Sequence, residues 1–225
     1  MRKVNGLKVL FLFFLTAACV TNTALAQVSL NLDIMSRYVW RGADFGNSPS
    51  FQPEISYSAG GFEIGTWAAV ATTGDPAGYE VDFFASYTFE TGAGDLSLMV
   101  TDYTFPVPGV GDYFSSDAHF IEAGVGYSGI AGTPLSFFAG MFLTNDDDNS
   151  MYLELGWDAE PIGFFIGMTP TESAMYGTSG AAIINTGIST SRTLKITDSF
   201  EIELSSSVIL NPYAEDLFFL VGFSL

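Results

Sequence analysis

The feature that most constrains the fold is a two-residue alternation in the last stretch of the chain, Leu217 to Leu225. Its odd-numbered positions hold Leu, Phe, Val, Phe and Leu, and its even-numbered positions hold Phe, Leu, Gly and Ser. Because side chains alternate between the two faces of a β-strand, this period predicts a strand that runs to the last residue. The stretch ends with an apolar, a small, an aromatic and a polar residue, Val221-Gly222-Phe223-Ser224.

The same four-residue ending recurs along the chain. The copies are Ile55-Ser56-Tyr57-Ser58, Ala85-Ser86-Tyr87-Thr88, Val125-Gly126-Tyr127-Ser128, Leu155-Gly156-Trp157-Asp158 and, with Ile at the aromatic position, Thr186-Gly187-Ile188-Ser189. We interpret the chain as six hairpins whose returning strands place aromatics at one level. Such a ring is typical of the membrane–water interface of a transmembrane β-barrel. The expected interface aromatics are Trp40, Tyr57, Tyr87, Tyr127, Trp157 and Phe223.

The N-terminal segment is typical of a secretory signal peptide. A basic start and an apolar run, Val9 to Val20, precede the small-x-small cleavage site Ala24-Leu25-Ala26. We therefore expect residues 1–26 to be removed and residues 27–225 to form one outer-membrane β-barrel domain. Lipoprotein processing at Cys19 is the alternative.

Composition argues against several classes of function. Cys19 is the only cysteine, so we expect no disulfide, thiol nucleophile or cysteine metal site in the mature chain. After residue 26, four Arg and Lys residues stand against 25 Asp and Glu, a formal charge of −21. Basic patches for nucleic acid or anionic lipid are therefore not expected. No glycine-rich phosphate loop or zinc spacing occurs, and we expect no cofactor and no metal site.

Alternating segments continue through the rest of the chain. The expected strands cover approximately residues 28–41, 50–59, 62–71, 79–90, 95–103, 118–128, 135–144, 150–158, 162–169, 181–190, 200–210 and 217–225. An even number of strands of this length is typical of bacterial outer-membrane barrels. The prediction is an all-β, antiparallel up-and-down transmembrane β-barrel of about 12 strands. Its expected location is the outer membrane of a Gram-negative-type bacterium, where lipid surrounds it.

One face of these strands is nearly all apolar, and the other mixes Gly and Ser with charged residues. A charge on a lipid-facing position near the bilayer midplane costs about 2–4 kcal/mol, so the charged face should point inward. In a secreted β-sandwich the apolar face would point inward instead. The repeated aromatic level favours the membrane barrel. The expected lumen residues are Asp33, Arg37, Arg41, Glu54, Glu80, Asp82, Glu122, Glu154, Glu201 and Glu203.

The first hairpin carries the run Ser36-Arg37-Tyr38-Val39-Trp40-Arg41-Gly42, followed by Pro49-Ser50-Phe51-Gln52-Pro53. This run resembles the opening signature of the TorF-family porins, Ser-x-Tyr-x-aromatic-Arg-Gly and then Pro-x-aliphatic-Gln. Asn211-Pro212-Tyr213 is similar to that family's last hairpin. Arg37 and Phe51 depart from the family pattern, in which acidic and aliphatic residues are common there. The resemblance implies an outer-membrane barrel that acts as a channel.

The closing strand resembles the C-terminal assembly signal of outer-membrane proteins. That signal usually ends in Phe, whereas this chain ends in Leu225 with Phe223 on the same face. The resemblance implies that the barrel-assembly machinery is a partner of the chain.

Two functions compete on this evidence. The first is a channel for passive diffusion of small cationic or neutral solutes, in which Arg37 and Arg41 either create a transverse field or form structural ion pairs. The second is a plugged barrel that serves as a structural or loop-mediated binding protein. It would result if the inward aromatics fill the lumen instead of forming a sliding surface for solutes. These aromatics are Trp67, Phe84, Phe138, Phe142, Phe165 and Phe218.

Two further motifs suggest chemistry only weakly. His119, the only histidine, follows Ser115-Ser116-Asp117, which invites a barrel-hydrolase interpretation; we favour an interface residue near the outer rim and expect no catalytic residues. Asp146-Asp147-Asp148 resembles part of a calcium loop but lacks the Gly and Glu that such a loop needs, so a solvated acidic loop is favoured.

Overall fold

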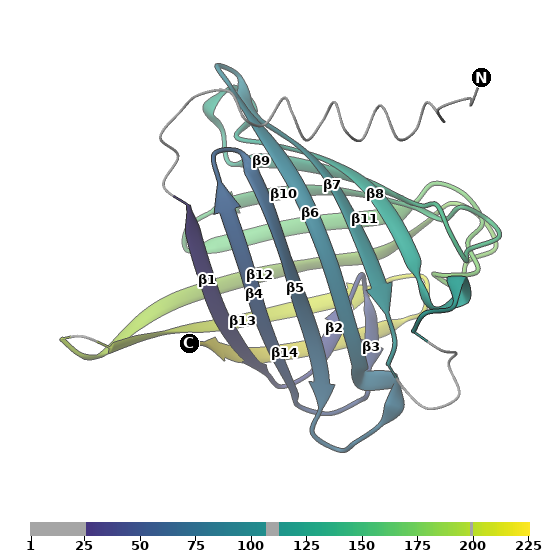
Figure 1. Cartoon of the computed structure of the whole chain (residues 1–225), viewed down its shortest axis with the longest axis horizontal. Helices are drawn as coiled ribbons and strands as arrows, with labels where there is room; N and C mark the ends of the chain where they lie inside the picture. Colours follow the sequence, from purple (N-terminus) through teal and green to yellow (C-terminus); the bar gives the residue numbers. More distant parts are fainter. Residues whose placement is uncertain (1–25, 107–112, 199) are drawn as a thin grey trace, which may run out of the picture.

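The computed structural model describes residues 26–106, 113–198 and 200–225. In these residues twelve strands form a closed antiparallel barrel, in which neighbouring strands along the wall pair and the first pairs with the last (Figure 1). The wall strands are β1 (Gln27–Met35), β4 (Ser50–Ala59), β5 (Phe62–Ala71), β6 (Tyr79–Thr91), β7 (Gly94–Thr104), β8 (Phe120–Ser128), β9 (Leu135–Phe142), β10 (Met151–Ala159), β11 (Ile162–Thr169), β12 (Ala182–Thr197), β13 (Phe200–Asn211) and β14 (Asp216–Ser224). The predicted fold is confirmed. The predicted signal peptide and Cys19 lie outside the described residues, except for Ala26.

Two short strands, β2 (Tyr38–Trp40) and β3 (Ala43–Phe45), form a separate hairpin. Short 3₁₀ turns, η1 (Pro76–Gly78), η2 (Ser116–Ala118) and η3 (Ile130–Gly132), lie in the connections. None of the helices in the described part of the chain has the length and hydropathy needed to cross a membrane.

The first strand is shorter than the sequence predicts. The prediction extends it to Arg41, but β1 ends at Met35 and the chain leaves the wall. Arg41 and Gly42 have positive φ angles of 47° and 79° and form the turn between β2 and β3. The sequence alternation continues past Met35 because Tyr38 and Trp40 occupy the positions that outward-facing residues of a longer first strand would have. Their rings pack inside the barrel instead of continuing the outward face.

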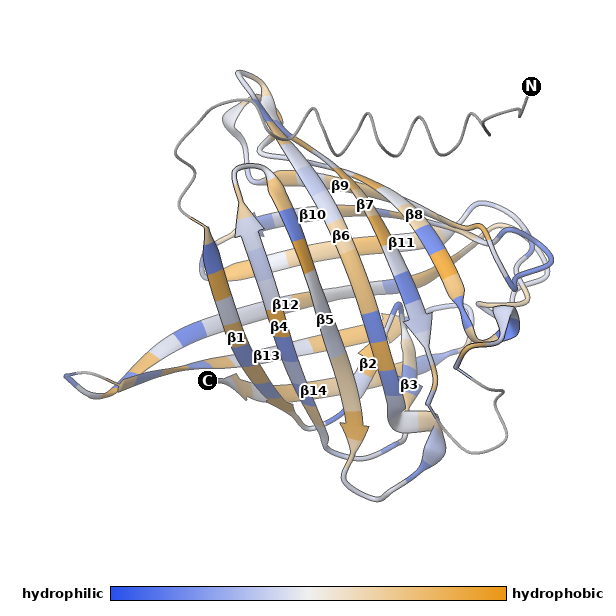
Figure 2. Cartoon of the chain, in the orientation of Figure 1, coloured by the Kyte–Doolittle hydropathy of each residue, from blue (hydrophilic) through white to orange (hydrophobic). Residues whose placement is uncertain are grey.

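The alternation along each strand separates an apolar outer face from a polar inner face, and Figure 2 shows the resulting bands of colour along the wall. Leu30, Phe164 and Phe219 are 73%, 51% and 67% exposed on the outside. Glu80 and Glu122, on the inside, are 5% and 3% exposed. A closed barrel with its apolar face outward excludes the β-sandwich, which would bury that face.

The two ends of the barrel differ. The connections β4–β5, β6–β7, β8–β9, β10–β11 and β12–β13 lie at one end together with Gln27 and Ser224, and we call this the turn end. We call the opposite end, which carries the β5–β6, β7–β8, β9–β10, β11–β12 and β13–β14 connections and the β2–β3 hairpin, the loop end (Figure 1).

The β12–β13 connection differs from the prediction. The sequence suggests a loop over residues 191–199, but β12 runs to Thr197 and pairs with β13. Since β11 pairs with β12 only as far as Ser189, the remaining residues form a two-stranded ribbon that projects beyond the wall (Figure 1). The β-branched residues Thr193, Ile196 and Thr197 favour this extension.

Candidate functional site

The loop-end half of the lumen is filled by the β2–β3 hairpin, which we call the plug (residues 36–49). Tyr38 contacts Trp67 of β5, with ring centroids 5.2 Å apart. Trp40 packs on Tyr103 of β7 and Phe142 of β9 at 5.6 and 6.4 Å. A hairpin that touches inward side chains of three wall strands must lie inside the barrel, and Figure 1 places it there.

Arg41, at the turn of the plug, forms the most complete polar contact in the lumen. Its Nη1 and Nη2 donate to Oε1 and Oε2 of Glu122 at 2.7 and 2.9 Å. Its Nη1 also donates to the Tyr176 hydroxyl at 2.6 Å, and Tyr103 donates to Oε2 of Glu122 at 2.9 Å. The side chains of Arg41 and Glu122 are 9% and 3% exposed. Because the buried charge of Arg41 is paired and hydrogen-bonded, the cost of removing it from water is offset.

Three aromatic rings surround the same guanidinium. The Cζ atom of Arg41 lies 4.5 Å from the ring centroid of Trp40, 5.5 Å from that of Phe138 and 4.3 Å from that of Tyr152. These distances fall within the range of cation–π attraction. Burial raises the pKa of Tyr176 to about 12, so its hydroxyl stays neutral beside Arg41.

The turn of the plug is fitted closely against β12. A Cβ atom on Gly42 would lie 1.9 Å from the carbonyl oxygen of Ile184, so only glycine allows this approach. The side chain of Asn211 donates to the Gly42 carbonyl at 3.1 Å and ties the same turn to β13. The Arg-Gly sequence at positions 41 and 42 therefore positions the guanidinium.

A second contact joins the plug to a pair of acids on β6. The Tyr38 hydroxyl donates to Oε2 of Glu80 at 2.9 Å. Asp82, two residues further along the same inward face, is 7% exposed, and its Oδ1 has no hydrogen-bond partner in the described residues. Both carboxyl groups are therefore covered where the plug meets the wall.

Sequence-predicted lumen residues divide into three groups. Asp33, Glu54, Glu80, Asp82, Glu122 and Glu154 lie on the inward face, as the register of their strands shows. Arg41 lies inside, but on the plug and not on the first wall strand. Arg37 also belongs to the plug, where it pairs with Asp44 and donates to Asn47 at 2.7 Å.

The last two predicted lumen residues lie at or beyond the end of the barrel. Glu203 pairs with Ser224 at the turn end, whereas Glu201 pairs with Lys195 on the projecting ribbon. The lumen assignment of Glu201 is therefore wrong, because the strands continue past the closed wall.

The turn-end half of the lumen has a different lining. Its inward cross-strand pairs are rich in hydroxyl groups: Ser29 with Ser56, Thr88 with Ser97, Ser128 with Ser136, Ser189 with Ser207, and Ser191 with Ser205. Acidic side chains lie around its rim, and we call them the turn-end mouth: Glu63, Glu90, Asp95, Asp158 and Glu203. The first four are absent from the predicted lumen set because they lie at predicted strand ends.

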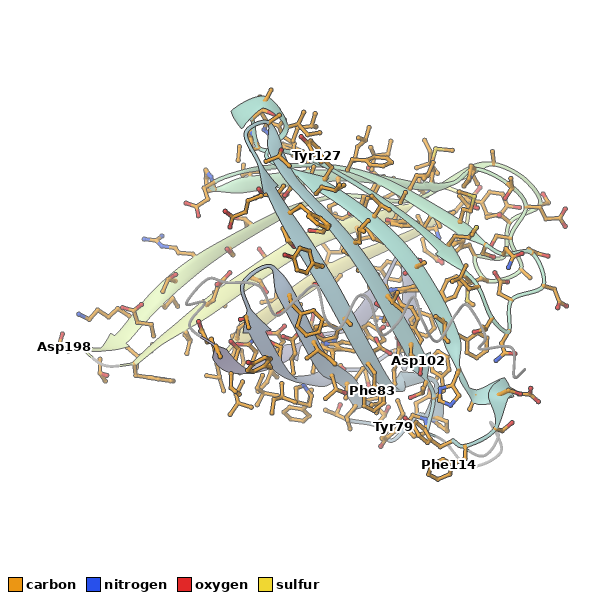
Figure 3. The ribbon with its side chains drawn as sticks, turned by 45° about the horizontal axis from the view of Figure 1, so that its top comes forward. Tyr79, Phe83, Asp102, Phe114, Tyr127 and Asp198 are labelled. Atoms are coloured by element: carbon orange, nitrogen blue, oxygen red, sulfur yellow. The ribbon has the colours of Figure 1, made fainter. Side chains whose placement is uncertain are left out.

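Five of the six predicted interface aromatics lie on the outer face toward the turn end. When the register is traced across the intervening strand, Tyr87, Tyr127 and Trp157 each lie two residues beyond the partner of the aromatic before, the stagger that tilted strands need to keep a common level. They are Tyr57, Tyr87, Tyr127, Trp157 and Phe223, and Figure 3 labels Tyr127 near the turn end. Trp40 is an exception because it belongs to the plug, so its interface assignment is wrong. The position at this level on β12 is Thr190, not Ile188.

His119 lies outside the lumen, at the loop end of the outer face. Its Nδ1 is 2.8 Å from Oδ2 of Asp102, and its Nε2 is 2.8 Å from the carbonyl oxygen of Tyr113. The hydrogen bonds to Asp102 and Tyr113 raise the pKa of His119. Since both ring nitrogens face acceptors, the imidazole ties the β7–β8 connection to Asp102 of β7. Figure 3 labels Asp102.

The acidic loop between β9 and β10 has a structural use. Asp146 accepts from the backbone N–H of Ser150, and Asp148 accepts from that of Ala174 at 2.6 Å. The Ser150 and Ser173 hydroxyls are 2.7 Å apart, so the β9–β10 and β11–β12 connections are joined at the loop end. In the described part of the chain no group of three or more His, Cys, Asp or Glu residues is placed to hold a metal ion.

Comparison with known proteins adds a family but no described activity. No curated protein matches the chain. The model of one protein family matches residues 20–178, which is more than half of the chain. On this evidence the chain, whose barrel holds an internal plug, belongs to Gcw_chp, a family of bacterial proteins of unknown function.

Proposed function

We propose that the protein is an outer-membrane β-barrel of the TorF-porin type that lets small cationic or neutral solutes cross the membrane by passive diffusion. The observation that carries the proposal is the closed twelve-strand wall, apolar outside and lined by hydroxyl and carboxyl groups inside. A closed antiparallel wall has no unpaired edge strand, so it suits a lipid environment. Lipid and the barrel-assembly machinery are then its expected partners.

The turn-end mouth supports the preference for cations. Glu63, Glu90 and Asp95 lie on adjacent strands, and Glu90 is the direct register partner of Asp95. Carboxylates gathered around a pore entrance attract cations and repel anions. The basic residues Arg37 and Arg41 both belong to the plug and are paired with Asp44 of the plug and Glu122 of β8, so neither offsets the charge of this mouth.

The plug favours a second candidate, a closed barrel that acts as a structural or loop-mediated binding protein. It fills the loop-end half of the lumen and is buried against the wall. The connections above it are joined to one another, for example through Ser150 and Ser173. If the plug never moves, solutes cannot pass and the exterior loops remain as the interacting surface.

The test is single-channel recording in a planar bilayer with a salt gradient. It uses the mature chain and a variant in which Asn-Gly replaces residues 37–48. The variant should fold because Met35 and Ser50 remain register partners, and heat-modifiable migration on a gel would verify this. We expect steady, cation-selective conductance from the variant. Silence or anion selectivity from the folded variant would reject the channel and leave the second candidate.

A further inference from the structure

The surroundings of Arg41 form a complete receptor for a guanidinium group. Glu122 supplies two parallel acceptors, the geometry in which a carboxylate binds guanidinium most specifically. Tyr176 supplies a third acceptor, and Tyr103 fixes the carboxylate. The rings of Trp40, Phe138 and Tyr152 enclose the cation. A structural ion pair needs only the carboxylate of Glu122. The additional hydroxyl acceptor and the aromatic rings define a pocket that prefers a guanidinium group as its ligand.

Most of this pocket does not belong to the segment that fills it. Glu122, Phe138 and Tyr152 are wall residues of β8, β9 and β10, and Tyr176 lies in the β11–β12 connection. Arg41 and Trp40 come from the plug. Because Met35 and Ser50 pair directly, residues 37–48 can leave the lumen while Ser36 and Pro49 keep their backbone hydrogen bonds to Val221 and Thr72. The contacts that break are those of the inner residues of the plug, such as Gly42 with Asn211. The wall side of the pocket then stays in place without Arg41 and Trp40, and it opens to the lumen.

We propose that this pocket is a binding site for an organic cation that carries a guanidinium or alkylammonium group, and that Arg41 occupies it as an internal substitute ligand. Aromatic rings favour such weakly hydrated cations over compact, strongly hydrated metal ions. A solute cation that competes with Arg41 for Glu122 releases the plug. This last step rests on the proposed channel function, whereas the binding site does not.

The pocket can be tested directly by emptying it. Arg41→Ala removes the internal guanidinium, and methylguanidinium chloride at millimolar concentration serves as the probe. We expect methylguanidinium to raise the unfolding temperature of Arg41→Ala in detergent micelles, relative to sodium chloride at equal ionic strength. The wild type, whose pocket is filled, should show no such shift. The double variant Arg41→Ala/Glu122→Gln should bind about tenfold more weakly or worse, because it loses a charge-assisted contact.

Arg37→Ala is the matched control. It removes the same charged group from the same hairpin, but Arg37 bonds only to Asp44 and Asn47 within the plug. It should therefore behave as the wild type. If Arg41→Ala does not fold, Arg41→Gln, which keeps hydrogen-bond donors beside Glu122, takes its place in the same assay.

The outcomes separate the two proposals. A folded Arg41 variant that methylguanidinium does not stabilise, or stabilises no more than Arg37→Ala, would overturn the binding site. Stabilisation of the Arg41 variant together with a silent plug-deletion variant would support the pocket and reject the channel. Stabilisation together with conductance that methylguanidinium increases in the wild type, but not in the plug-deletion variant, would support both the pocket and its release of the plug.

Discussion

At the scale of single residues, His119 offers the clearest test, because it is the only histidine and gives one NMR titration. Its ring nitrogens face the Asp102 carboxylate and the Tyr113 carbonyl, which are both hydrogen-bond acceptors. Only the imidazolium form donates a hydrogen bond from both ring nitrogens at once. We expect the imidazole to titrate above the ordinary His pKa of about 6.5. A raised folded-state pKa means that the stabilisation is complete below the ordinary pKa and is lost as the pH rises through the raised value.

The measurement is the Hε1 chemical shift of His119 between pH 5 and pH 9. Asp102→Asn, which keeps the shape of the side chain and removes its charge, is the control and should return the midpoint toward the ordinary value. A wild-type midpoint at or below about 6.5 would contradict the geometry of this contact.

Residue identity alone separates Trp40 poorly from the predicted interface aromatics that lie on the outer face. Tyr87 and Trp157 stand in a returning strand directly before a turn, and their neighbours alternate through the whole strand. Trp40 has the same local alternation, but the residues after it, Arg41 and Gly42, turn the chain inward with positive φ. The partners that decide its position, such as Tyr103 and Phe142, are far away in sequence. Local periodicity therefore predicts on which face of a strand an aromatic lies. It does not predict whether that aromatic lies outside the barrel or inside the lumen.

At the scale of elements, the projecting ribbon of β12 and β13 should be dispensable for the barrel. Residues 194–202 lie beyond Ser189, the last β12 residue that pairs with β11, and Glu203, the last β13 residue that pairs with β14. Replacing residues 194–202 by an Asn-Gly turn keeps the Thr193–Glu203 pair and suits a two-residue hairpin. We expect folding yield and resistance to urea to stay at the wild-type level, because the described residues of this ribbon pair only with each other and not with β11 or β14.

The check is a urea titration followed by heat-modifiable gel migration. Removing four residues of β13 inside the wall, 205–208, is the contrasting variant and should prevent folding, since these residues pair with both β12 and β14. A large loss of stability from the shortened ribbon would mean that it belongs to the wall.

Most of the wall follows from the sequence, whereas the plug does not. Inward and outward residues of β6 are as predicted, because alternation is a local property with a fixed period. The ribbon is missed because Thr190 and Arg192 interrupt the apolar face of the strand before Leu194 and Ile196 resume it. The Arg41 pocket draws on a hairpin turn, four wall strands and a distant connection, and no local pattern joins such positions. Of its members, Arg41 and Glu122 are predicted as lumen residues, while Tyr103 and Tyr176 are not.

At the scale of the whole molecule, the uneven lining of the lumen predicts where selectivity arises. The loop-end half holds Arg41 and its partner Glu122, which offset each other. The turn-end mouth carries only acids, including the directly opposed Glu90 and Asp95. Like charges placed opposite each other repel, and a passing cation relieves that repulsion. The mouth, and not the plug region, should therefore set the sign of the ion preference.

The prediction is that Glu63→Gln/Glu90→Gln/Asp95→Asn moves the reversal potential toward zero. It is made in a plug-deletion variant that also carries Glu122→Gln, because deleting the plug removes Arg41, the partner that offsets the Glu122 charge. Asp147→Asn, on an exposed loop at the other end, is the control for a change in acidic charge and should leave the reversal potential nearly unchanged. Selectivity of the parent should also fall between 0.1 M and 1 M salt, as the Debye length shortens from about 10 Å to about 3 Å. A reversal potential that resists both the triple variant and high salt would place the selective step deeper in the lumen. Glu54 and Asp33, which lie inward on neighbouring strands, would then be the next residues to neutralise.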